Sequence, residues 1–302
     1  MDATAVSHVR AFNRALGERI GALEDHFLGR ARPMGESRVL WEIGEDGADV
    51  RDLRSRLGLD SGYLSRVLRS LEAARLVKVE PSRADRRMRR VRLTAAGRAE
   101  RAELDRRSDE VAWSFLEPLD TRQRESLVAA MDSVERLLRA SMVTFEVEDP
   151  STRDARWCLE QYFAELNERF DAGFDPGRGI SADPEELVPP AGLFVIARLR
   201  GRPVGCGALK FHGRAPTELK RMWISRDVRG LGVGRRLLAD LERRTAAAGA
   251  RVVRLETNRN LKEAIALYRS SGYREVAAFN DEPYAHHWFE KRLSPGTGRP
   301  SR

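Results

Sequence analysis

The residues with the clearest capacity for chemistry form a glycine-rich turn, Arg229-Gly-Leu-Gly-Val-Gly-Arg235, directly before an expected helix. Glycines at a helix start let backbone N–H groups approach an anion, and the helix dipole stabilises its negative charge. The turn does not fit a dinucleotide-binding loop, because position 237 is leucine rather than glycine. It is not a P-loop either, since no Gly-Lys-Ser/Thr follows. Such a turn alone is a weak signal, so the segments around it decide its meaning.

Two patterns flank this turn. A strand-like segment, Glu218-Leu-Lys-Arg-Met222-Trp-Ile224, precedes it, and Ala264-Ile-Ala-Leu-Tyr268-x-x-x-Gly272-Tyr follows it. With the turn, they resemble the GNAT acetyltransferases over residues 143–293. The order of strand-like and helix-like segments is that of an α/β fold with a mixed, mostly antiparallel sheet.

The resemblance implies acetyl-CoA as co-substrate, with no metal, and direct attack of a substrate amine on the thioester. The residues implied to wrap the pyrophosphate are Arg229, Gly230, Leu231, Gly232, Val233, Gly234 and Arg235. The backbone of Met222, Trp223 and Ile224 is implied to pair with the pantetheine arm, with one amide polarising the thioester carbonyl.

Two side chains are candidates for proton transfer. Tyr268 matches the family tyrosine that protonates the departing thiolate, and its alternative reading is a core aromatic beside Leu267. A free amine has a solution pKa near 10, so it must lose a proton before attack. Glu218 stands where several relatives place a base, although it could instead orient the amine or cap the strand end.

The chain departs from the family at one position. Many relatives have asparagine seven residues before the tyrosine, where this chain has Leu261. Asn258 and Asn260 are the candidates for the missing cofactor contact, and we assign it to Asn260. His286 and His287 do not suggest a metal site, because adjacent strand residues point to opposite faces.

The N-terminal half predicts a winged helix-turn-helix. A helix is expected over residues 6–28, another opened by Pro33, a short one over 50–57, and a fourth from residue 61. Strands at 76–80 and 90–94 form a hairpin with an arginine-rich turn. The fourth helix is expected to show Ser61, Tyr63, Ser65, Arg66 and Arg69 to solvent.

This half resembles the MarR family of regulators. The resemblance rests on Asp60-Ser-Gly-Tyr-Leu-Ser-Arg-Val-Leu-Arg-Ser-Leu-Glu, on Asp85-Arg86-Arg87, and on Leu93-Thr-Ala-Ala-Gly97. It implies a homodimer on double-stranded DNA at a pseudo-palindromic operator. The hairpin residues implied to brace the wing or contact DNA are Arg83, Asp85, Arg86 and Arg87. The alternative is a winged helix kept only for dimerisation.

Length and composition fit two domains, which we place at residues 1–141 (MarR type) and 142–295 (GNAT type), with a disordered tail at 296–302. The net charge of +8 favours polyanionic partners without naming one. Two cysteines suggest a reducing cytosol, and no stretch reaches the length of a membrane helix. We therefore expect a cytoplasmic protein with no membrane partner.

Three functions remain open. The chain could bind operator DNA and acetylate a small amine, an amino acid or a protein amino group. It could be a regulator whose GNAT half senses acetyl-CoA or another effector without turnover. It could also be an acetyltransferase whose MarR half only dimerises. Retention of Glu218, the complete turn and Tyr268 argues for the first over the second.

Overall fold

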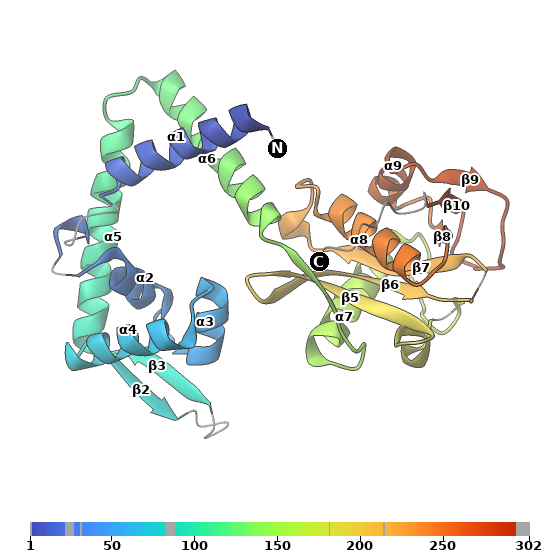
Figure 1. Cartoon of the computed structure of the whole chain (residues 1–302), viewed down its shortest axis with the longest axis horizontal. Helices are drawn as coiled ribbons and strands as arrows, with labels where there is room; N and C mark the ends of the chain where they lie inside the picture. Colours follow the sequence, from blue (N-terminus) through green and yellow to red (C-terminus); the bar gives the residue numbers. More distant parts are fainter. Residues whose placement is uncertain are drawn as a thin grey trace. The chain divides into compact units, whose positions relative to one another are not determined.

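The computed structural model describes residues 2–21, 27–30, 32–81, 88–180, 182–213 and 215–293 (Figure 1). The chain divides into two compact units, Met1–Met131 and Asp132–Arg302, whose border lies within one helix, α6 (Thr121–Ser141). The proposed wing residues Arg83, Asp85, Arg86 and Arg87 lie outside the described residues, as does the tail 296–302.

The N-terminal unit is mainly helical with one small sheet. Its elements before α6 are α1 (Ala3–Arg19), the 3-10 turn η1 (Phe27–Gly29), α2 (Met34–Glu42), β1 (Ala48–Asp49), α3 (Val50–Leu57), α4 (Ser61–Ala73), β2 (Val77–Pro81), β3 (Arg89–Leu93) and α5 (Ala95–Leu116). The expected single helix over 6–28 is wrong, because α1 ends at Arg19 and Gly21 has a positive φ of 64°.

A tight turn joins α3 to α4. The positive φ of Gly58, 64°, ends α3, and the Asp60 side chain accepts a hydrogen bond of 2.8 Å from the Tyr63 N–H to begin α4. The inward face of α4 buries leucines against Leu53 and Leu104. Burying one such side chain contributes about 1.5–3 kcal/mol. The pair is a helix-turn-helix held by an apolar core.

The strands of this unit form a hairpin with a short third strand beside it. β2 pairs antiparallel with β3 from Val77↔Leu93 to Pro81↔Arg89, as the sequence predicts. β1, which the sequence analysis missed, adds only two residues on the other side of β3. The sheet order is β1-β3-β2, and the hairpin is the wing of a winged helix-turn-helix.

The C-terminal unit is built on one seven-stranded sheet of order β4-β5-β6-β7-β8-β10-β9. Its elements are β4 (Thr144–Val147), α7 (Arg153–Arg169), η2 (Pro184–Leu187), β5 (Gly192–Leu199), β6 (Arg202–Lys210), β7 (Thr217–Ile224), η3 (Arg226–Val228), α8 (Val233–Ala247), β8 (Val252–Thr257), α9 (Lys262–Ser270), β9 (Arg274–Val276) and β10 (His287–Arg292). Among the described strands of this sheet, β7 and β8 alone pair in parallel, which confirms the mixed, mostly antiparallel sheet.

Helices cover both faces of this sheet (Figure 1). Side chains alternate along a strand, so β5 sends Phe194 and Ile196 to one face and Val195 to the other. The first two pack with Cys158 of α7, whereas Val195 packs with Leu237 of α8. The sheet is therefore buried on both sides.

Candidate active site and nucleic-acid interface

Strands β7 and β8 run side by side for only two residue pairs. Their register is Thr217↔Val253 and Glu218↔Arg254, and it ends there. Beyond Glu218, β7 remains paired with β6 on its other edge up to Ile224. The edge of β7 that faces β8 is therefore left open over residues 219–224. An extended ligand can bind there as an added strand.

A β-bulge deforms β7 at this opening. Cys206 pairs with Trp223 and Ala208 with Lys220, so Arg221 and Met222 together oppose the single residue Gly207. Arg221 has a positive φ of 55°, which is uncommon for a residue with a side chain. Adjacent strand residues ordinarily face opposite sides. The bulge lets Lys220, Arg221 and Met222 line one pocket.

The glycine-rich turn opens α8 as the sequence predicts. Gly230 and Gly232 have φ values of 74° and 77°, a conformation that favours glycine. A Cβ at either glycine would meet no atom within 4 Å, so the turn faces open space. Gly232 is the N-cap of α8 and no side chain caps the helix. Its first N–H groups are therefore available to an anion.

A groove of about 510 Å³ runs from this turn along β7. The predicted cofactor residues that line it are Met222, Trp223, Ile224, Arg229, Gly230, Gly232, Gly234 and Arg235. The side chains of Leu231 and Val233 pack instead into a core cluster around Ala140 and Val228. Only their backbone could contact a ligand in the groove.

The guanidinium of Arg229 is held within the groove. It forms an ion pair with Glu165 of α7 and donates a 2.8 Å hydrogen bond to the Ile224 carbonyl. Glu165 also accepts hydrogen bonds from Trp223 Nε1 at 2.9 Å and from Arg169. Burial alone would raise the pKa of Glu165, but the hydrogen bond and charge of Arg229 and the hydrogen bonds from Trp223 and Arg169 together lower it. The sequence analysis missed Glu165.

Tyr268 lies buried on α9 with its hydroxyl 3.9 Å from the Met222 sulfur. Its ring packs against Tyr273 and Phe289, with centroids 5.7 and 6.0 Å away. Burial raises the pKa of Tyr268 above the ordinary value of 10.0, and the charge of Glu256 adds to this. The phenol therefore keeps its proton at neutral pH and can donate it.

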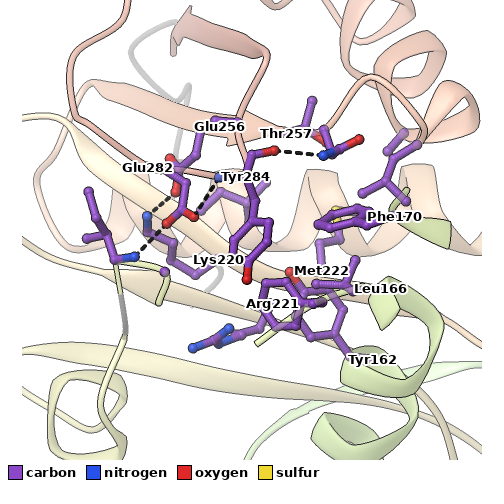
Figure 2. A pocket seen from close by; sticks show the side chains of 18 of the residues that line it. Tyr162, Leu166, Phe170, Lys220, Arg221, Met222, Glu256, Thr257, Glu282 and Tyr284 are labelled. Atoms are coloured by element: carbon purple, nitrogen blue, oxygen red, sulfur yellow. Dashed lines mark hydrogen bonds and ion pairs between the residues drawn. The ribbon is translucent and has the colours of Figure 1, made fainter. Parts of the chain in front are cut away.

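A second cavity, of about 110 Å³, meets the groove at Met222 and Tyr268. Residues between α7 and η2 line it, including Phe174 and Ile180, together with Phe170 at the end of α7. Glu256, Glu282 and Lys220 gather at one side, and Phe170 and Leu166 lie opposite (Figure 2). The side chains in this cavity that the sequence analysis missed are Tyr162, Lys220, Arg221, Glu256, Glu282 and Tyr284.

Glu218 lines neither the groove nor the second cavity. Its carboxylate accepts a 2.6 Å hydrogen bond from Arg254 and lies 3.3 Å from Lys220 Nζ. Burial raises the pKa of Glu218, but the hydrogen bond from Arg254 and the charges of Lys220 and Arg254 bring it below 4.5. Lys220 also forms an ion pair with Glu256, so it bridges the two glutamates.

Asn260 lies outside the groove lining as well. Its side-chain amide donates to the Arg169 carbonyl at 2.8 Å and to Asp171 at 3.1 Å. Asn258 lines the second cavity and donates to the Tyr284 carbonyl at 2.8 Å. The two asparagines thus brace loops, and Leu261 lines both the groove and the cavity at the position where many relatives have asparagine.

The outer face of α4 carries most of the predicted DNA contacts. Ser61, Ser65, Arg66 and Arg69 are exposed, as expected. The expectation that the Tyr63 side chain faces solvent is wrong, because this side chain is partly buried against the core. A Cβ on Gly35 would lie 2.2 Å from the Tyr63 hydroxyl, so the phenol covers α2 at that glycine.

The described residues contain no group of three or more His, Cys, Asp or Glu side chains that could hold a metal ion. No helix among them is both long and apolar enough to cross a membrane.

The open edge of β7 and the anion-facing turn define a class of protein that takes up an extended ligand with an anionic end. Residues 151–273 match the acetyltransferase (GNAT) family model, and residues 31–88 match the MarR family model. The chain belongs to the GNAT family of N-acetyltransferases, which use acetyl-CoA, and it carries a MarR family domain ahead of the acetyltransferase domain.

Three relatives illustrate the two halves. The chain is 38% identical over 103 residues to the IAA acetyltransferase of Azospirillum brasilense, covering 34% of this chain and 66% of that one. It is 35% identical over 126 residues to the N-alpha-acetyltransferase RimI of Mycobacterium tuberculosis, covering 41% and 74%. It is 42% identical over 67 residues to the HTH-type transcriptional regulator TtmR of Methylorubrum extorquens, covering 22% and 33%.

Proposed function

We propose that this protein acetylates the amino group of a small amine, an amino acid or a protein, and that it also binds operator DNA as a dimeric regulator. The observation that carries the enzymatic half is the meeting of two cavities at Met222 and Tyr268. The groove has an anion-facing turn and an open strand edge for acetyl-CoA. The second cavity opens onto the same tyrosine from the other side.

The glycine-rich turn supports pyrophosphate binding through its backbone. With no side-chain cap on α8, the first N–H groups of the helix can donate to phosphate oxygens. Arg235 at the turn adds positive charge; its guanidinium also donates a 3.1 Å hydrogen bond to the Ser270 hydroxyl. The pantetheine arm then lies along the free edge of β7, where a backbone N–H near Met222 polarises the thioester carbonyl.

The reaction moves an acetyl group and two protons. The amine nitrogen forms a bond to the carbonyl carbon, and the carbon–sulfur bond breaks. The nitrogen of the ammonium form gives up two protons over the whole reaction. One proton is released, and the departing thiolate takes one from the Tyr268 hydroxyl, which is reprotonated afterwards. The Tyr268 phenol is protonated at neutral pH, since burial only raises its pKa above the ordinary value of 10.0, so its hydroxyl can donate to the thiolate as it forms.

The sequence makes Glu218 a candidate base that could instead orient the amine or cap the strand end, and we propose that it acts by positioning. Arg254 and Lys220 hold its carboxylate, and it lines neither cavity. Through Lys220 it is linked to Glu256, which does line the second cavity. Replacing Glu218 would therefore disturb Lys220 and Glu256 without removing a group that touches the amine.

The DNA-binding half of the proposal rests on α4 and on α1. Ser65 and Arg66 are exposed on α4, the second helix of the helix-turn-helix, where they can reach base edges in a major groove. The 17-residue α1 buries none of its side chains, and its Val9 and Phe12 are 58% and 48% exposed. A helix with such a face ordinarily has a partner. A second copy of the chain would cover it.

The acetyltransferase proposal is tested by two measurements on one preparation. Calorimetric titration with acetyl-CoA measures binding, and release of free thiol in the presence of amines measures turnover. Binding with turnover supports the proposal. Binding without turnover on any amine or peptide N-terminus would instead support an acetyl-CoA sensor, and absence of binding would refute the site.

A further inference from the structure

We propose that the acetyl acceptor is a free amino acid with an aromatic or apolar side chain, its ammonium bound by Glu256 and its carboxylate by Arg221. This inference rests on the proposed acetyltransferase function and narrows it. It is drawn from the charges of the second cavity and from which of them already have partners.

Glu256 offers an acceptor that no described residue of the protein uses. One carboxylate oxygen pairs with Lys220. The other, Oε2, is buried and has no hydrogen-bond partner among the described residues, and the residue itself lines the cavity. The side chain is 9% exposed. A buried acceptor without a partner is unfavourable, and a bound ammonium would remove that penalty.

Arg221 offers the complementary donor. Within the described part of the chain, its guanidinium forms no ion pair and no side-chain hydrogen bond. The group stacks over the rings of Phe163 and Tyr162, 4.8 and 5.9 Å from their centroids. The guanidinium fork fits a carboxylate with two parallel hydrogen bonds. The bulge and the positive φ of Arg221 present this residue to the cavity beside Lys220.

The charges of the cavity make a zwitterion the best match. Lys220 and Arg221 balance Glu256 and Glu282, and the Glu282 oxygens already accept backbone hydrogen bonds from Ile180 and Tyr284, at 2.6 and 3.3 Å. Lys220 is likewise taken by Glu256. One positive and one negative group are left open, so a plain amine would leave Arg221 unpaired.

The pKa of the Tyr162 hydroxyl depends on the same charges. Burial raises the pKa of Tyr162 to about 12, with Arg221 lowering it and Glu256 and Glu282 raising it further. The charges of Arg221, Glu256 and Glu282 therefore all reach the Tyr162 hydroxyl.

An aromatic wall forms the rest of the cavity. The rings of Phe170, Phe174 and Tyr284 contact one another, with centroids 4.8 to 5.8 Å apart. Leu166 and Ile180 complete the apolar surface. Such a wall gains free energy by covering an apolar or aromatic side chain.

Thiol release from acetyl-CoA tests the inference with matched acceptors: L-phenylalanine, L-phenylalanine amide and phenethylamine, and the corresponding leucine series. We expect kcat/KM for the free amino acids to exceed that for the amides and decarboxylated amines by about 10- to 150-fold, the range of a charged hydrogen-bond pair.

Arg221→Asn should abolish this preference, because asparagine tolerates the positive φ but carries no charge. The matched control is Arg200→Asn, which has the same substitution at an exposed arginine with φ 51° outside both cavities. Glu256→Gln should lower kcat/KM for all amines alike, because every acceptor carries the amino group. Calorimetric affinity for acetyl-CoA should be unchanged in all three variants.

Equal kcat/KM for amino acid and amide, or an equal effect of Arg221→Asn on both, would overturn the zwitterion and leave the acetyltransferase intact. Binding of acetyl-CoA without acetylation of any free amino acid overturns the inference too. A wild-type protein that binds no acetyl-CoA refutes the proposed function itself.

Discussion

The Tyr268 hydroxyl lies 3.9 Å from the sulfur of Met222, and both residues line the groove and the second cavity. Met222 stands on the open strand edge and Tyr268 on α9, so the groove and the second cavity share lining residues from both elements. A thioester in the groove and an amine in the cavity would approach each other here. Substitutions at this junction should therefore affect turnover more than binding.

Tyr268→Phe should lower kcat by about 10²-fold and leave KM for acetyl-CoA nearly unchanged, because the hydroxyl acts only as the thiolate departs. The ring contacts with Tyr273 and Phe289 are retained, so the fold should be intact. Tyr273→Phe is the matched control, since this buried tyrosine lines neither cavity. Steady-state thiol release measures both variants. Near wild-type turnover in Tyr268→Phe would assign the proton transfer to water or another group.

Gly232→Asp should weaken acetyl-CoA binding at least about tenfold, because it adds negative charge where the pyrophosphate meets the helix start. The positive φ of 77° also strains any side chain there. Gly249→Asp is the control, with a φ of 87° and equally open surroundings at the far end of α8. Calorimetric titration compares the two. An unchanged affinity in folded Gly232→Asp would rule out the turn as the phosphate site.

Glu165→Gln should destabilise the acetyltransferase domain in a pH-dependent way. Because its partners hold the pKa of Glu165 below 4.5 in the folded state, the carboxylate adds stability above that pH and loses it as the pH falls through the folded-state value. The urea midpoint of the wild type should exceed that of the variant at pH 7, and the difference should shrink below about pH 4.5.

Glu168→Gln serves as the control for this experiment. Glu168 lies on the same helix and pairs with Arg226, but both side chains are more than 60% exposed. An exposed pair contributes little to stability, so this variant should match the wild type at every pH. A pH-independent loss in Glu165→Gln would show that the carboxylate charge is not what stabilises the groove.

The DNA-binding proposal predicts that arginines at different positions contribute to DNA affinity in two different ways. Replacing Arg86 or Arg87 with alanine should weaken binding to all duplexes and reduce the salt slope by roughly one phosphate. Replacing Arg66 should cost about 1–3 kcal/mol on the operator only, if the side chain contacts a base edge in two places. Fluorescence anisotropy across a salt series, with operator and scrambled duplexes, separates these outcomes.

The promoter upstream of the protein's own coding region is the first place to look for a pseudo-palindromic operator, because a two-fold dimer presents two α4 helices about one helical turn apart. Wild-type protein that binds neither duplex at low salt would leave the N-terminal half with a dimerisation role alone.

Much of the fold could be predicted because local signals set its elements. Asp60 caps α4, Gly58 ends α3, and Gly232 begins α8, each through a residue whose conformation or side chain is specific to that position. The prediction of one helix over residues 6–28 is wrong at its C-terminal end. The helical spacing of apolar residues continues in the sequence beyond Gly21, where the backbone leaves the helical conformation.

The site could be predicted only in part. Backbone contacts follow from glycines and strand order, so the turn and β7 were found. The bulge that brings Arg221 beside Lys220 depends on pairing with β6 and has no local signal. Glu256 sits in an ordinary strand pattern, and its significance arises only because β7 and β8 part at Glu218. Tyr63 was assigned to solvent because its contact with α2 is long-range.

Because both cysteines are buried, the folded protein should be almost unreactive toward thiol reagents. Cys158 and Cys206 are fully covered, and burial, with Cys158 beside it, raises the pKa of the Cys206 thiol well above its ordinary value. A colorimetric thiol assay on the native protein should therefore report coenzyme A alone. In denaturant the same reagent should find two further thiols per chain. One reagent thus counts turnovers in the folded enzyme and measures the fraction of molecules that have unfolded.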